Sequence, residues 1–149
     1  MAALSLHVEI AAPVDRVAAF FVPQRMPYWF GSEMRAEFEV QGGAADFAVG
    51  QKVRVAGRMG GQDVALTAVV TAFQPARLLE WRFTDAYGVR GLQRWELSAA
   101  PNGTHVAMRD EYEMQGALGR LLDRIFTRHA VARRDRAWLA KLKQLAERT

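Results

Sequence analysis

The stretch that decides the fold runs from Gln115 to Arg148 and reads QGALGRLLDRIFTRHAVARRDRAWLAKLKQLAER. It contains no proline, its glycines lie near its start, and strong helix formers dominate it, so it predicts one long helix. Each half has an apolar stripe, but at 100° per residue the second stripe lies about a third of a turn from the first. We therefore expect a bend, or a change of packing partner, near residues 128–136. The first stripe contains Leu118, Leu121, Leu122, Ile125 and Phe126, and the second contains Val131, Trp138, Leu142 and Leu145.

The chain before this helix alternates apolar and polar residues in seven short segments, a pattern typical of half-buried strands. These segments are residues 4–10, 33–40, 52–59, 63–73, 78–84, 90–98 and 104–112. Pro13 suits the first turn of a short helix, and residues 28–30 indicate a second, very short helix. The pairs Gly60-Gly61 and Asn102-Gly103 indicate tight turns between strands.

This order of elements predicts an α+β fold with one domain over residues 1–149. Consecutive strands joined by tight turns indicate an antiparallel sheet with one apolar face. A sheet of about seven such strands would curl, and the C-terminal helix is the only element large enough to fill its hollow. We therefore expect a curved antiparallel sheet wrapped around the long helix, with two short helices after strand 1.

Composition restricts the possible functions. The 149 residues include no cysteine, which excludes disulfides and thiol catalysis. Three scattered histidines offer no metal-ligand spacing, and no phosphate-binding loop or hydrolase motif is present, so we expect no metal and no cofactor. The N-terminus does not have the pattern of a signal peptide, and we expect a cytoplasmic protein.

The net charge of +4 is unevenly distributed. Residues 116–149 carry nine Lys or Arg against three Asp or Glu, which makes this segment +6 and the rest of the chain −2. Such a helix could contact an anionic membrane or nucleic acid, or it could simply present a solvated Arg-rich face. Because no nucleic-acid-binding motif accompanies the charge, we expect no nucleic-acid partner, at most a weak membrane contact, and a monomer or weak homodimer.

Several motifs resemble those of one superfamily. They are the strand-to-helix entry IAAPVDRV at residues 10–17, Trp29 after the Pro27 turn, VGQKV at 49–53, VTAFQPARL at 70–78, GTHV at 103–106 and LAKLKQLAE at 139–147. Together with the element order, they resemble the START-like (SRPBCC) superfamily and its helix-grip fold. Within the superfamily, the chain is most similar to the polyketide cyclase/dehydrase and lipid-transport group.

The resemblance implies an apolar cavity between sheet and helix that holds a hydrophobic small molecule such as a lipid, a quinone or a polyketide-like compound. The protein would then be a carrier or sensor. The alternative is an enzyme, a cyclase or dehydratase that acts on an aromatic or polyketide substrate in the same cavity. The scarcity of ionisable groups among the inward-facing residues favours a binder.

Strand alternation and helical spacing predict which side chains face this cavity. The sheet and the short helices would contribute Trp29, Met34, Phe38, Val55, Leu66, Trp81, Phe83, Gln93, Trp95, Met108, Asp110 and Tyr112, and the helix Leu118, Leu122, Ile125 and His129. An aromatic core would, however, give the same pattern.

If the protein is an enzyme, the candidates for proton transfer are Asp110, His129 and Tyr112. A carboxylate on an apolar face must be paired or shifted in pKa, and Asp110 could instead form a salt bridge with Arg120 or Arg124. His129 could equally be a hydrogen-bonded residue of the core or its rim.

Overall fold

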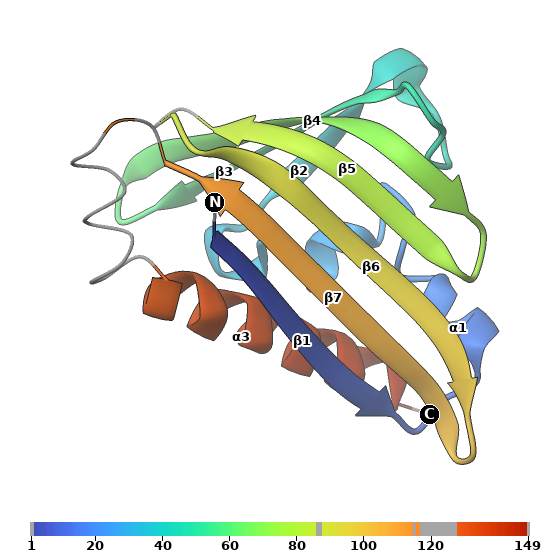
Figure 1. The fold of residues 1–149 in the computed structure, drawn as a ribbon. Helices are drawn as coiled ribbons and strands as arrows, with labels where there is room; N and C mark the ends of the chain where they lie inside the picture. The colour runs from blue at the N-terminus through green and yellow to red at the C-terminus, as the bar shows by residue number, and fades with distance from the viewer. Residues whose placement is uncertain (1, 86–87, 115, 117–127, 149) are drawn as a thin grey trace.

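The computed structural model describes residues 2–85, 88–114, 116 and 128–148, and within them one antiparallel sheet of seven strands wraps around a C-terminal helix (Figure 1). The strands lie in the order β1-β7-β6-β5-β4-β3-β2. In this sheet of the described residues, β1 pairs with β7, and every other pair of adjacent strands is consecutive in sequence. Their bounds are Ala2–Ile10 for β1, Glu37–Val40 for β2, Lys52–Met59 for β3, Gln62–Gln74 for β4, Leu78–Asp85 for β5, Arg90–Ala100 for β6 and Gly103–Glu113 for β7. The predicted helix-grip fold is thereby confirmed.

The sheet curves because its strands are long, tightly joined and locally irregular. Gly60 and Gly61 form the two-residue turn between β3 and β4, as predicted, and both have the positive φ that such a turn requires. The pairing of β4 with β5 shifts register between Val70 and Ala72, an irregularity of the kind that bends a strand. The strands therefore arch over α3 and the short helices (Figure 1).

Short helical segments connect β1 to β2 and fill part of the concave side. They are the α-helix α1 at Val14–Ala18 and the 3-10 helices η1 at Met26–Tyr28 and η2 at Ser32–Met34; a further one, η3 at Gln41–Gly43, follows β2. The structure thus has more short helices than the two predicted after strand 1.

The expectation that residues 33–40 form one strand is wrong. β2 begins only at Glu37, because the chain turns through left-handed backbone conformations at Gly31 and Arg35 on either side of η2. Glu33 is exposed, as expected, and its Oε2 accepts a hydrogen bond from Trp138 Nε1 at 2.7 Å. The alternation of apolar and polar residues did not reveal this turn, because such a pattern carries no information on backbone φ angles.

Helix α3, Arg128–Ala146, lies against β1 and α1 on the concave side of the sheet (Figure 1). Its end is held by Lys143 Nζ, which donates to the Glu9 carbonyl at 2.7 Å, and by the Ala11 amide, which donates to Glu147 Oε2 at 2.7 Å. Residues 115 and 117–127, where the helix was predicted to begin and where its first apolar stripe lies, are outside the described residues.

The middle of the concave side is filled by aromatic side chains packed edge to face. The Phe30 ring makes such contacts with Trp29, Trp81 and Trp95 at centroid distances of 6.0, 5.5 and 5.7 Å. All four side chains are buried, and Trp29 Nε1 donates to the Phe20 carbonyl at 2.9 Å. This core separates the concave side into two ends, each of which contains a cavity.

Candidate functional site

The candidate site is a cavity of about 270 Å³ at the end of the concave side near the β3–β4 turn. Strands β3 to β7 and η2 line it on one side and the first half of α3 on the other. Its lining residues are Phe30, Glu33, Met34, Val55, Met59, Val64, Ala65, Leu66, Phe83, Asp85, Val89, Gln93, Asp110, Tyr112, Val131, Arg134 and Trp138. Most of this lining is apolar, as is usual for a site that holds a small organic molecule.

One close backbone approach shapes the apolar wall. A Cβ added at Gly57 of β3 would lie 2.5 Å from the Met34 carbonyl oxygen, so only glycine allows η2 to pack this closely on the strand. The approach brings Met34 into the wall beside Val55. The Gly at position 57 therefore sets the width of the cavity on this side.

The buried polar residues that line the cavity, Gln93 and Asp110, lie together on β6 and β7. Gln93 and Asp110 are paired across these strands, and each side chain is only 1% exposed. Trp81 Nε1 donates to Gln93 Oε1 at 2.8 Å, which orients the amide so that Gln93 Nε2 donates to Asp110 Oδ2 at 3.5 Å. The carboxyl group of Asp110 is thus held by the sheet and faces the cavity.

Helix α3 brings a second carboxyl group and a guanidinium to the same place. Arg134 Nη2 donates to Asp110 Oδ2 at 3.4 Å and to Asp135 Oδ1 at 3.2 Å, so one arginine joins both carboxyl groups. The Asp135 side chain is fully buried, whereas that of Arg134 is 40% exposed. No N–H group and no hydroxyl in the described part of the chain donates to Asp110 Oδ1 or Asp135 Oδ2.

The pKa of Asp135 is strongly raised. Burial is the largest cause that raises the pKa of Asp135 to about 9, followed by its hydrogen bond with Asp110 and the charge of that group, while Arg134 acts in the opposite direction. A hydrogen bond between two carboxyl groups requires that one of them be protonated. At neutral pH, Asp135 is therefore protonated, and the carboxyl group that lines the cavity is that of Asp110.

An aromatic residue of α3, Trp138, lines the cavity beside Arg134. The guanidinium of Arg134 lies 4.5 Å from the ring centroid of Trp138, and Trp138 Nε1 is bonded to Glu33 of η2. These contacts link the helix to the short segment on the opposite wall. They also hold Arg134 in place, so that its position between the two carboxyl groups is supported on both sides.

Seven of the residues expected to face the cavity do line it: Met34, Val55, Leu66, Phe83, Gln93, Asp110 and Tyr112. Five others do not contribute to the lining but belong to or pack against the hydrophobic core: Trp29, Phe38, Trp81, Trp95 and Met108. Alternation correctly places the strand residues among these five on the concave face. It did not show that Phe30 fills the space in front of them.

The expectation for His129 differs from the structure, which places this residue on the exposed side of α3. The physical reason is that α3 buries Trp138, and nine residues at 100° each put His129 on the opposite face of the helix. The other helix residues expected at the cavity, Leu118, Leu122 and Ile125, are outside the described residues. So are Arg120 and Arg124, the expected partners of Asp110, whose partner in the described residues is Arg134.

Sequence reasoning missed Arg134, Asp135 and Trp138 as residues of the site. A signal was present, because Asp135 lies four residues after Val131 and three before Trp138, on the stripe that helical spacing predicts to be buried. The argument applied to Asp110, that a carboxylate on an apolar face must be paired or neutralised, applies equally to Asp135.

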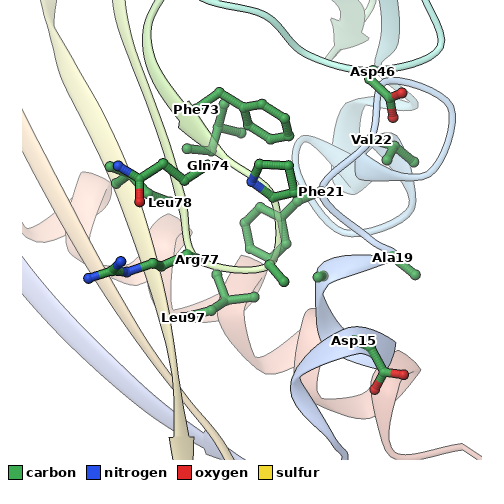
Figure 2. Close-up of a pocket in the computed structure, with 14 residues that line it drawn as sticks. Asp15, Ala19, Phe21, Val22, Asp46, Phe73, Gln74, Arg77, Leu78 and Leu97 are labelled. Carbon is green, nitrogen blue, oxygen red and sulfur yellow. The ribbon is translucent and has the colours of Figure 1, made fainter.

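A second cavity, of about 440 Å³, lies at the other end of the concave side, between α1 and the β4–β5 turn (Figure 2). Phe21, Phe73 and Leu97 contribute to its apolar part. The charged side chains that line it, those of Asp15, Asp46 and Arg77, are exposed. Because none of its polar side chains is buried, it lacks fixed groups that would orient a ligand. The cavity lined by Gln93 and Asp110 is therefore the better candidate.

The described residues contain neither a membrane-spanning helix nor a cluster of metal-binding side chains. No helix among them is long and apolar enough to cross a membrane. No group of three or more His, Cys, Asp or Glu side chains in those residues is arranged to hold a metal ion.

Solved structures share this fold at low sequence identity. Protein CV1439 from Chromobacterium violaceum is 18% identical with a TM-score of 0.72, and the match covers 99% of each chain. Ara h 8.0201 is 11% identical with a TM-score of 0.75 and 97% coverage of both chains. DynU16, from the dynemicin biosynthetic locus, is 18% identical with a TM-score of 0.66, and the match covers 97% of this chain and 47% of that one.

No curated protein matches the chain in sequence. A family match nevertheless extends over residues 1–147, nearly the whole chain, and agrees with the fold that the structure shows. The chain belongs to the polyketide cyclase/dehydrase and lipid transport family.

Proposed function

We propose that this protein binds a hydrophobic small molecule in the cavity between the sheet and α3, as a carrier or sensor. The observation that carries the proposal is an apolar cavity of about 270 Å³ whose buried polar groups are gathered at one place. Apolar walls supply the free energy of burial, roughly 25 cal/mol per Å² before association costs, and the polar group orients the ligand.

The volume limits the size of the ligand. An apolar cavity of about 150 Å³ accommodates benzene, so by proportion about 270 Å³ accommodates a molecule of roughly 11 non-hydrogen atoms. A fused two-ring molecule such as 2-methylnaphthalene has this size. The expected ligand is therefore a compact ring system, or the ring portion of a larger molecule that extends past Arg134 toward solvent.

A pair of variants on one strand tests the proposal. Leu66 of β4 is half-buried and lines the cavity, so Leu66→Trp would fill it without displacing close-packed core. Val69, on the same strand, is 39% exposed and does not line the cavity, which makes Val69→Trp the matched control.

The measurement is an NMR titration with 2-methylnaphthalene, together with native mass spectrometry of the freshly purified protein. The wild type and Val69→Trp should show saturable shifts that Leu66→Trp does not show. A folded wild-type protein that gives no saturable shift, and carries no apolar molecule after purification, would contradict the proposal.

A second candidate function, proton abstraction, is favoured by one observation: a buried carboxylate, that of Asp110, lines the apolar cavity next to a guanidinium. Asp110 would take a proton from the carbon beside a carbonyl, the electron pair of that C–H bond would pass to the carbonyl oxygen, and Arg134 would stabilise the enolate. The test is deuterium exchange at the α-carbon of 2-tetralone in D₂O. An Asp110-dependent rate above the solvent rate supports catalysis, and a rate equal to that of Asp110→Asn contradicts it.

A further inference from the structure

The chemistry of the ligand's polar group can be inferred from the hydrogen bonds at Asp110. Its Oδ2 accepts from Gln93 and Arg134, whereas no N–H group and no hydroxyl in the described residues donates to its Oδ1. The side chain is 1% exposed and lines the cavity. Buried carboxylate oxygens in folded proteins have hydrogen-bond partners, so the acceptor capacity of Asp110 on the cavity side needs a donor.

Asp135 satisfies only part of this capacity. Protonated Asp135 is hydrogen-bonded to Asp110, and Asp135 itself is not among the residues that line the cavity. A carboxylate oxygen has two lone pairs, so the oxygen that accepts this proton retains one more. The proton is thus directed at Asp110 and not at the ligand, and the group that faces the ligand is an acceptor.

The charges within the cluster of Asp110, Asp135 and Arg134 balance. With Asp135 protonated, the carboxylate of Asp110 is balanced by the guanidinium of Arg134. That guanidinium already donates to both carboxyl groups and lies over the ring of Trp138. An anionic ligand would have to approach Asp110 and compete for these donors, whereas an uncharged donor would not.

We propose that the ligand carries an uncharged hydroxyl group that donates a hydrogen bond to Asp110, so that the cavity selects compact ring alcohols or phenols over hydrocarbons and carboxylates. This inference rests on the proposed binding function and adds the chemical class of the ligand. It makes Asp110 the residue that determines specificity, with Gln93, Asp135 and Arg134 as positioning residues.

The test compares three probes of similar size at pH 7: 2-naphthol, 2-methylnaphthalene and 2-naphthoate. The first two differ by a hydroxyl in place of a methyl group, so their affinity ratio isolates the proposed hydrogen bond. Because hydrogen bonds to charged groups are stronger than neutral ones, 2-naphthol should bind about 10- to 100-fold more tightly than 2-methylnaphthalene. The carboxylate 2-naphthoate should bind more weakly than 2-naphthol.

Two substitutions assign the preference to Asp110. In Asp110→Asn the acceptor is neutral, and the ratio should fall to about threefold or less. Asp63→Asn is the matched control, because the Asp63 side chain on β4 is 90% exposed and does not line the cavity, so the ratio should remain that of the wild type. The wild-type ratio alone keeps the inference testable if Asp110→Asn does not fold.

Each outcome is decisive. Equal wild-type affinities for 2-naphthol and 2-methylnaphthalene overturn the inference while the binding function stands. Tighter binding of 2-naphthoate assigns recognition to Arg134 and also overturns it. If none of the probes binds, the proposed function itself fails, and the inference fails with it.

Discussion

Replacement of Asp135 by Asn should make the protein's stability less dependent on pH. In the folded protein Asp135 retains its proton to about pH 9, whereas an ordinary Asp in the unfolded chain releases it near pH 3.8. Between these values the folded state binds one more proton than the unfolded state. The free energy of unfolding therefore falls as pH rises, at up to about 1.4 kcal/mol per pH unit from this group. The contribution is fully present below pH 3.8 and is lost as pH rises through 9.

The groups around Asp135 support this sign. Asp110 acts in the same direction as burial and raises the pKa of Asp135, whereas Arg134 opposes it. Asn cannot ionise, so the difference in unfolding free energy between Asp135→Asn and the wild type should move in favour of the variant by up to about 4 kcal/mol between pH 5 and pH 8. Contributions of all other titrating groups cancel in this difference to the extent that their surroundings are unchanged.

The assay is urea denaturation followed by tryptophan emission at pH 5, 6, 7 and 8. Asp63→Asn is the control, because Asp63 has a side chain that is 90% exposed, next to Arg58. Its difference from the wild type should stay within about 0.5 kcal/mol at every pH. A difference for Asp135→Asn that is constant across this range would refute the reasoning, since it would mean that Asp135 is ionised in the folded state at neutral pH.

Three further predictions concern Gly57, Thr104 and the basic C-terminal segment. Gly57→Ala should lower the unfolding free energy by about 1–3 kcal/mol, because the new Cβ would lie 2.5 Å from the Met34 carbonyl oxygen; the measurement is the urea midpoint, and an unchanged midpoint contradicts it. Thr104→Val should cost about 1–3 kcal/mol in the same assay, because buried Thr104 Oγ1 donates to the Ala12 carbonyl at 2.7 Å. Binding to anionic vesicles should be weak and should disappear near 0.15 M salt, where the screening length is about 8 Å; binding that persists in co-sedimentation at this salt would instead support a membrane role for the basic C-terminal segment.

The sequence by itself determined the fold class. Alternation on β6 and β7 correctly placed Gln93, Trp95, Met108, Asp110 and Tyr112 on the concave face, because side chains in a strand change sides at every residue. Gly60-Gly61 correctly located a turn, since its conformation requires positive φ. Both rules depend only on neighbouring residues in the chain, and they correctly predicted the strand faces and the turn.

Only the tertiary structure decided which inward side chains form a cavity and which form the core. Phe30 comes from the segment between β1 and β2, and its insertion among Trp29, Trp81 and Trp95 depends on how the sheet curls over that segment. Glu33 likewise reached Trp138, 105 residues further along the chain, only because two backbone turns redirected the expected strand.

The carboxyl pair shows the same division most clearly. The sequence indicated that Asp110 on an apolar face needs a partner, but the predicted partners were Arg120 or Arg124, and the buried position of Asp135 was missed. That these two groups meet each other, with Arg134 between them, follows from the angle and depth at which α3 lies on the sheet. The distances between atoms of β7 and α3 are set by packing of the whole core, and no local pattern in either segment contains them.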